Sequence, residues 1–303
     1  MMNFFIRVAS VIEPEYRARK IKSKVISFFY ILYLCIRHLD RIIRSFNGDY
    51  LVIPRLEIAV TSRCSLKCKN CSSLMQYYKK PFDISVDTNV KTIRRILDAA
   101  DQVNQLKILG GEPFLYKDLD KILSEVSKHE NVKKVLIITN GTIVPQGEAL
   151  LKQLSNEKVS IRISYYGEYS RNRDKILEVC EQNKIKCYAK FEREMWQSPG
   201  GIDRRNRSLK NIKKQYKKCD ASLCNNLLDG KLHHCARSSN GMNLGVIPDE
   251  PADYLDVLKY ESRESLRREL LKFLYHDRGY LLACDYCDFA THDSHEVIPG
   301  EQM

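Results

Sequence analysis

The 303-residue sequence lacks an apolar stretch long enough to cross a bilayer. Its longest apolar run, Val25–Ile36, has twelve residues, whereas a transmembrane helix needs about 20. No small-residue cleavage site follows this run, which argues against a secretory signal peptide. No repeat with a period of roughly 20–50 residues is visible, so a solenoid is excluded. The composition of the whole sequence, with 44% hydrophobic and 29% charged residues, is typical of a globular protein with a sizeable core.

Carboxylates are the scarcer charged groups, with 38 Asp and Glu against 50 Lys and Arg. The excess is concentrated in residues 1–50, whose net charge is +5, and in residues 203–218, whose net charge is +7. Aromatic residues are not interleaved with these basic groups, so nucleic acid is not favoured as a partner. Each segment is either a solvated surface or a site for an anionic partner. In the second segment five lysines share one helical face: Lys210, Lys213, Lys214, Lys217 and Lys218.

The run Val25–Ile36 has basic residues on both sides, with Lys22 and Lys24 before it and Arg37 and Arg41 after it. Two interpretations are open. The run is either a helix buried against a catalytic domain or a basic amphipathic helix that lies at a membrane surface.

The eleven cysteines are an odd number, which argues against a closed set of disulfides. Three of them, Cys64, Cys68 and Cys71, fall within eight residues, and others gather in the C-terminal third. Such clusters without an export signal indicate metal ligands that are kept as thiolates in a reducing compartment. We therefore expect a cytoplasmic protein, either free or peripheral at the inner face of the membrane.

From Arg55 onward, short apolar runs alternate with amphipathic stretches, which predicts βα units and a parallel sheet. The expected strands are Leu56–Val60, Gln105–Leu109, Lys134–Thr139, Val159–Tyr165 and Lys186–Phe191. The expected helices lie near Val86–Ala100, Leu119–Lys128, Glu148–Leu154 and Arg171–Gln182. Such units wind into an open or closed α/β barrel, whose ligands sit at the carboxyl ends of the strands. We expect three regions: a basic, apolar helical segment (1–54), the catalytic barrel (55–200) and a smaller cysteine-rich region (201–303).

The segment TSRCSLKCKNC follows the first predicted strand and gives the spacing Cys64-x3-Cys68-x2-Cys71. Three thiolates on a short loop can hold a four-iron cluster and leave one iron open. Zinc is the alternative, but a structural zinc site would need a fourth ligand from elsewhere. One βα unit later, Gly110–Gly111–Glu112–Pro113 follows the second strand.

Together these segments resemble the radical S-adenosylmethionine (SAM) superfamily, which implies a partial (β/α)6 barrel and a [4Fe–4S] cluster held by Cys64, Cys68 and Cys71. The resemblance assigns the amino group of SAM to Gly110, Gly111, Glu112 and Pro113. It assigns polar contacts to the ribose and carboxylate of SAM to Thr139, Asn140 and Ser164. The sequence departs from the family at Asn70, where an aromatic residue is usual.

A second cysteine group comprises Cys219, Cys224, Cys235, Cys284 and Cys287, with a hairpin signal at Asp229–Gly230. Its spacing resembles the SPASM and twitch appendages of radical SAM enzymes, which implies an auxiliary [4Fe–4S] cluster. Cys219, Cys235, Cys284 and Cys287 match the twitch spacing best, and Cys224 is the alternative to Cys219. A surplus Cys224 could instead donate a hydrogen atom. Four thiolates would also suit zinc.

The resemblance implies an enzyme that cleaves SAM to a 5′-deoxyadenosyl radical. We expect it to oxidise or epimerise a saccharide or a nucleotide- or lipid-linked sugar, with a reductant such as flavodoxin or ferredoxin. The alternatives are a maturase that modifies peptide or protein side chains, and a non-catalytic protein that binds zinc or nucleic acid.

Overall fold

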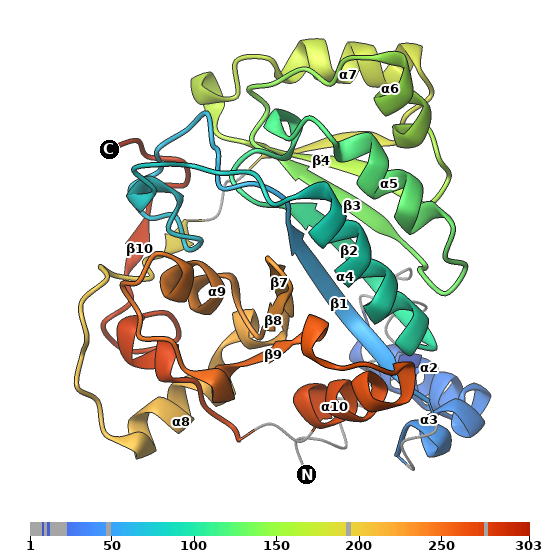
Figure 1. Ribbon diagram of the computed structural model, residues 1–303, viewed down its shortest axis with the longest axis vertical. Coiled ribbons are helices and arrows are strands. Elements are labelled where there is room, and N and C mark those ends of the chain that lie inside the picture. The colour runs from blue at the N-terminus through green and yellow to red at the C-terminus, as the bar shows by residue number, and fades with distance from the viewer. Residues whose placement is uncertain (1–7, 9–10, 13–22, 47–49, 192–194, 276–277) are drawn as a thin grey trace.

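The computed structural model describes the chain except for residues 1–7, 9–10, 13–22, 47–49, 192–194 and 276–277. Lys22 and most of the residues before it therefore lie outside the described residues. Five parallel strands form the centre of the fold (Figure 1): β1 (Val52–Ala59), β2 (Gln102–Leu109), β3 (Val135–Thr139), β4 (Val159–Tyr165) and β5 (Cys187–Phe191). All five predicted strands are confirmed, and β1 and β2 each begin three or four residues earlier than expected.

Four helices connect these strands: α4 (Val86–Ala99), α5 (Leu119–Ser127), α6 (Glu148–Leu154) and α7 (Arg173–Gln182). Their apolar residues and those of one sheet face form the main core, which includes the fully buried Ile58, Ile96 and Ile108. The apolar stripe of each helix and the apolar face of the sheet are both buried only when the helices pack as a layer against the sheet. The predicted α/β fold class is therefore confirmed.

The sheet does not end at β1. Its strand order is β5-β4-β3-β2-β1-β7-β8-β9, so three strands from the cysteine-rich region extend it. The strand β7 (Asn226–Leu228) pairs parallel to β1 and supplies a sixth parallel strand, whereas β8 (Lys231–His233) and β9 (Tyr254–Asp256) are antiparallel. The predicted turn at Asp229–Gly230 joins β7 to β8, and both residues have the positive φ of a type I′ hairpin.

The cysteine-rich region also contains α8 (Leu209–Lys218), α9 (Ala236–Asn243) and α10 (Arg263–Tyr275). Figure 1 shows α8 and α9 on the side of β1 away from α5 to α7. A two-stranded ribbon of β6 (Trp196–Gln197) and β10 (Glu296–Val297) ties the end of the barrel to the end of the chain.

Helix α2 (Lys24–Arg37) contains the predicted apolar run, and α3 (Leu39–Phe46) follows it. Leu34 and Ile42 are buried in a small cluster with Val52, but most of the apolar side chains on these helices face outward. The interpretation of the run as a buried helix is therefore wrong for most of its length. None of the described helices combines the length and apolarity that crossing a membrane demands.

Candidate functional site

The loop after β1 brings Cys64, Cys68 and Cys71 together. Burial raises the pKa of the Cys64 thiol to about 12, and the charges of Cys71 and Cys68 add to this rise. Burial, followed by the charge of Cys71, raises the pKa of Cys68 to about 11. Because thiols influence each other this way only at short range, the three sulfurs form one cluster of potential ligands.

Each sulfur of this loop also accepts hydrogen bonds. The side chain of Asn140 donates to Sγ of Cys64 over 3.7 Å, and that of Gln302 donates to Sγ of Cys68 over 3.5 Å. Cys71 accepts from the backbone N–H groups of residues 73–75. Donors of this kind favour the thiolate form and tune iron–sulfur clusters, so the surroundings fit a thiolate-bound group.

The two glycines after β2 let the backbone of that strand approach the cysteine loop. A Cβ at Gly111 would lie 2.1 Å from the carbonyl oxygen of Arg63, and one at Gly110 would lie 2.3 Å from that of Thr61. The amide N–H of Gly111 donates instead to Thr61 over 2.8 Å. The glycines are therefore required for two neighbouring strand ends to close on each other.

Glu112 is fully buried below this loop. Its carboxyl accepts hydrogen bonds from the hydroxyl of Thr139 and the backbone N–H of Asn140, both over 2.8 Å. Burial raises its pKa to about 7, against the effect of these donors. Glu112 thus joins the end of β2 to the end of β3, and neither its side chain nor buried Pro113 lines the cavity described next.

The cysteines open into a cavity of about 520 Å³ at the carboxyl ends of the strands. Its wall includes the predicted Gly110, Gly111, Thr139, Asn140 and Ser164. It also contains Asn70, which stands where the family usually has an aromatic residue, and Trp196, whose ring lies edge-on to Tyr166 at 5.5 Å. The cavity therefore brings thiols, amides, hydroxyls and aromatic rings together in one place.

The sequence analysis did not anticipate three groups at this site: Gln302, Arg162 and Trp196. Gln302 belongs to a segment, Glu301–Met303, that crosses the cysteine loop. Lys69 donates its amide N–H to Glu301 over 2.7 Å, and Met303 donates to Lys67 over 2.9 Å. Contacts between residues more than 230 positions apart leave no signal in the local pattern of either segment. For Arg162, the signal was available, because a charged residue interrupts an otherwise apolar strand.

Comparison with known proteins agrees with this geometry. A family model described as the Radical SAM superfamily matches residues 58–191, which run from β1 to the end of β5. The chain contains a radical SAM domain. Domains of this family use a [4Fe–4S] cluster and SAM, which the cysteine loop and the adjoining cavity are suited to hold.

The curated relatives of the radical SAM domain include the GTP 3′,8-cyclase of Clostridium acetobutylicum, which is 33% identical over 118 residues. This match covers 39% of the chain and 35% of the relative. The GTP 3′,8-cyclase of Stenotrophomonas maltophilia R551-3 is 34% identical over 94 residues, 31% of the chain and 28% of the relative. The chain thus spans about a third of the length of the curated relatives it matches.

Solved structures also resemble the chain. BtrN in complex with AdoMet and 2-DOIA has a TM-score of 0.43 and 18% identity, over 82% of this chain and 98% of that one. Native anSMEcpe with bound AdoMet and the Kp18Cys peptide has a TM-score of 0.36 and 22% identity, over 46% and 42%.

Outside the radical SAM domain, the structure brings four further cysteines together. Cys219 follows the last residue of α8, and Cys235 precedes the first residue of α9. Cys284 lies within the short 3₁₀ turn Leu282–Tyr286, and Cys287 follows that turn. Burial raises the pKa of Cys235 and Cys284, and the charges of the other members of the group add to the rise. Cys235 and Cys287 each accept a backbone N–H over 3.4 Å.

Cys224 is placed elsewhere. Its sulfur accepts a hydrogen bond from Nη1 of Arg55 over 3.6 Å, and the charged groups that act on it are those of Glu57, Arg55 and Lys107. Burial raises the pKa of Cys224 to about 11. His233 and His234 pack against Tyr254 and Phe273, respectively. Among the described residues, no three His, Cys, Asp or Glu side chains are arranged to hold a single metal ion.

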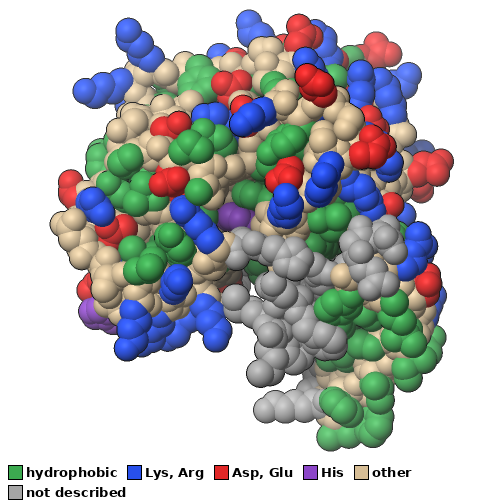
Figure 2. Space-filling view, turned by 60° about the horizontal axis from the view of Figure 1, so that its bottom comes forward, with side chains coloured by type: hydrophobic (Ala, Val, Ile, Leu, Met, Phe, Trp, Pro, Cys, Tyr) green, Lys and Arg blue, Asp and Glu red, His purple; other side chains and the backbone are tan. Residues whose placement is uncertain are grey.

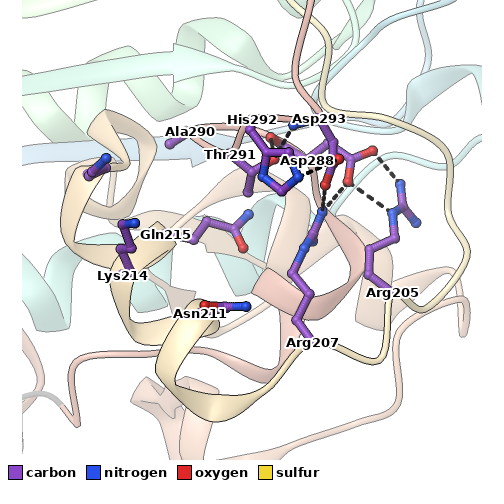
Figure 3. A pocket seen from close by; sticks show the side chains of 11 residues that line it. Arg205, Arg207, Asn211, Lys214, Gln215, Asp288, Ala290, Thr291, His292 and Asp293 are labelled. Atoms are coloured by element: carbon purple, nitrogen blue, oxygen red, sulfur yellow. Dashed lines mark hydrogen bonds and ion pairs between the residues drawn. The ribbon is translucent and has the colours of Figure 1, made fainter.

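A second cavity, of about 900 Å³, lies beside Cys287 (Figure 3). In it, Arg205 and Arg207 bind Asp288 over 2.9 and 2.6 Å, and Arg207 also reaches Asp293 over 3.0 Å. Arg204 pairs with Asp285. The arginines of the basic segment 203–218 are therefore occupied within the protein, and the exposed charge of that segment comes from the lysines of α8.

Proposed function

We propose that this chain is a radical SAM enzyme in which Cys64, Cys68 and Cys71 hold the [4Fe–4S] cluster. The observation that supports the proposal most directly is the convergence of the three thiols on a cavity walled by Gly110, Gly111 and Asn140. When bound, the cluster and SAM supply a 5′-deoxyadenosyl radical that removes a hydrogen atom from the substrate.

The chain's own residues would bind, orient and enclose the reactants. The backbone at Gly110–Gly111 lines the cavity and would accept the amino group of SAM held there, and Thr139, Asn140 and Ser164 would offer polar contacts to its ribose. The aromatic rings of Tyr166 and Trp196 close one side and limit the entry of water. Glu112 would fix the register of the two strand ends without touching the reactants.

The proposed substrate is a saccharide or a nucleotide- or lipid-linked sugar, which would be oxidised or epimerised at a hydroxyl-bearing carbon. Amides, hydroxyls and aromatic rings in one cavity suit a polyhydroxylated molecule. The relatives named GTP 3′,8-cyclase carry a nucleotide in their name, which is compatible with a nucleotide-linked sugar.

We further propose that Cys219, Cys235, Cys284 and Cys287 hold an auxiliary [4Fe–4S] cluster. The mutual proximity of these four thiols and the separate placement of Cys224 support this choice over Cys224. Burial raises the pKa of Cys71 and of Cys287, and the charge of Arg237 opposes the rise at both, so Arg237 lies near both cysteine groups.

In an epimerisation, Cys224 is the proposed hydrogen donor. Its S–H bond would break as a C–H bond forms on the substrate radical, which leaves a thiyl radical on Cys224. An electron from a carrier such as flavodoxin or ferredoxin and a proton from water would then restore the thiol. The support is its placement apart from the other four cysteines, beside Arg55 of β1. Cys224→Ala should then stop formation of the product, which is followed by its uptake of deuterium from deuterated solvent, but leave the cleavage of SAM intact. Loss of iron from this variant would instead identify Cys224 as a ligand.

The test of the radical SAM proposal is anaerobic reconstitution. The chain should bind about eight irons, four per cluster, and form 5′-deoxyadenosine from SAM and dithionite. Cys68→Ala should abolish that product, whereas Cys35→Ala, which removes a cysteine outside both groups, should not. A colourless, zinc-containing protein would contradict the proposal, and a modified peptide as the product would favour the maturase alternative.

We also propose that α2 and α3 lie on an anionic membrane surface. Ten of the 18 exposed large hydrophobic side chains in the described residues belong to these two helices, and they include Phe28, Phe29 and Ile36 at more than 60% exposure. Figure 2 shows hydrophobic side chains gathered over this part of the molecule. Arg37, Arg41 and Arg44 are exposed on the same helices, where anionic headgroups would bind them.

Flotation with vesicles of phosphatidylcholine and phosphatidylglycerol tests this placement. Phe28→Glu combined with Phe29→Glu should reduce binding at least tenfold, because each buried Phe side chain contributes about 1.5–3 kcal/mol. Tyr169→Glu, a matched change at an exposed aromatic outside α2 and α3, should leave binding unchanged. Equal binding by all three proteins, or self-association that the double variant abolishes, would overturn the proposal.

A further inference from the structure

The inner face of the parallel sheet carries charged side chains where such sheets are usually apolar on both faces. Strand β4 shows the pattern: Ile161 and Ile163 are fully buried in the main core, and Arg162 between them points to the opposite face. Arg55 and Glu57 on β1 and Lys107 on β2 occupy the same inner face. Burying charge at four positions is costly unless each charge has a partner.

Three of these four charges have partners within the protein. Lys107 and Glu57 are direct neighbours across β2 and β1, and their charged groups lie 3.0 Å apart. Arg55 donates to the sulfur of Cys224. The side chain of Arg162 differs from them, because it makes no ion pair or hydrogen bond with any described residue, and its Nε is buried without an acceptor.

Arg162 lines the cavity into which the cysteines of the radical SAM domain open. Among the described residues of that wall it is the one charged side chain, and no carboxylate accompanies it. Glu112, the nearest candidate in the sequence motif, is buried and already bonded to Thr139 and Asn140. The described part of this wall therefore provides a guanidinium and no carboxylate to balance it.

We propose that Arg162 binds an oxyanion of a molecule held in this cavity, through the two-pronged contact that a guanidinium makes with carboxylate or phosphate. The inference rests on the proposed function, because that function places SAM and a substrate in the cavity. Arg162 precedes Ser164 by two residues on the same face, so it lies about 6.6 Å deeper along the strand. The oxyanion is either the carboxylate of SAM or a phosphate of the substrate.

Equilibrium binding to the reconstituted protein separates these two sources. If the carboxylate of SAM is the ligand, Arg162→Gln weakens SAM binding about 10- to 100-fold, while decarboxylated SAM binds the variant and the unmodified protein equally. If a phosphate is the ligand, SAM binding is unchanged, and inorganic pyrophosphate binds the SAM-loaded protein but not Arg162→Gln. In either case Arg162→Lys recovers part of the affinity, because it keeps the charge and loses the planar fork.

Iron content and the formation of 5′-deoxyadenosine by the unmodified protein report on the proposed function independently of Arg162. Lys175→Gln, which removes an exposed positive charge on α7, is the matched control and should bind both probes normally. If Arg162→Gln retains its iron and binds SAM and pyrophosphate within twofold of the unmodified protein, the proposal is overturned.

Discussion

Glu112 is a carboxyl group enclosed by protein, with its pKa raised to about 7 by burial. Because the pKa of Glu112 is higher in the folded protein than in the unfolded chain, its protonated carboxyl stabilises the fold, and this contribution is complete below about pH 4.5. That contribution is lost as the pH rises through about 7. The residue therefore makes the join between β2 and β3 sensitive to pH in the physiological range.

Replacing Glu112 with Gln should remove this sensitivity. Between pH 5 and pH 8, the free energy of unfolding of the unmodified protein should fall by up to about 3 kcal/mol relative to Glu112→Gln. Urea unfolding of both proteins under anaerobic conditions measures the difference. Identical pH slopes for the two proteins would show that Glu112 is ionised throughout and that its hydrogen bonds from Thr139, Asn140 and the backbone N–H of Phe114 outweigh burial.

Gly111, which precedes Glu112, lies where the structure has no room for a side chain. Substitution by Ala would force a Cβ against the backbone oxygen of Arg63, and the displaced backbone carries the neighbouring Cys64. We expect Gly111→Ala to bind less than half the iron of the unmodified protein after reconstitution. Gly201→Ala is the control, since the nearest atom to its Cβ is 3.8 Å away. Full iron binding by Gly111→Ala would contradict the required close approach.

At the scale of elements, the segment Glu301–Met303 holds the cysteine loop through two backbone hydrogen bonds and the contact of Gln302 with Cys68. Deleting these three residues exposes the loop to solvent. We expect the iron–sulfur absorbance of the deletion variant to fade in air several times faster than that of the unmodified protein. Glu301→Gln, which removes only an exposed ion pair with Lys69 at 3.5 Å, should fade at the normal rate.

The elements differ in how well the sequence predicts them. Strands β1 to β5 and helices α4 to α7 were predicted within a few residues, because each buries an apolar pattern of its own. The hairpin turn at Asp229–Gly230 was also predicted, since both residues tolerate positive φ. The pairing of β7 with β1 was not predicted, because three residues carry no information about which sheet edge they join.

The residues of the candidate site also differ in how well the sequence predicts them. Cysteine spacing and the adjacent glycines predicted that the three thiols of the first loop and the glycines lie at one site, since those residues act through local geometry. The separation of Cys224 from the other four cysteines depends instead on its position beside Arg55, about 170 residues earlier in the chain. The exposed surface of α2 and α3 was one of two interpretations that the apolar run left open, and only packing distinguishes them.

At the scale of the whole molecule, the proposed regions 55–200 and 201–303 share one sheet, because β7 pairs with β1. Buried contacts of α10 with the main core strengthen this join. We therefore expect a single cooperative unfolding transition in urea, with far-ultraviolet circular dichroism and iron–sulfur absorbance changing together. Two separated transitions would show that the regions fold independently and that the sheet pairing contributes little.

The contact between the cysteine loop and Glu301–Met303 also imposes an order in time. Lys69 and Glu301 are 232 positions apart, so a ribosome that adds 5–20 residues per second needs roughly 12–46 s to travel from one to the other. Throughout that interval the three thiols of the loop are synthesised but uncovered. Iron and sulfide can be delivered to them before the last segment arrives, and delivery after it arrives requires the segment to lift away.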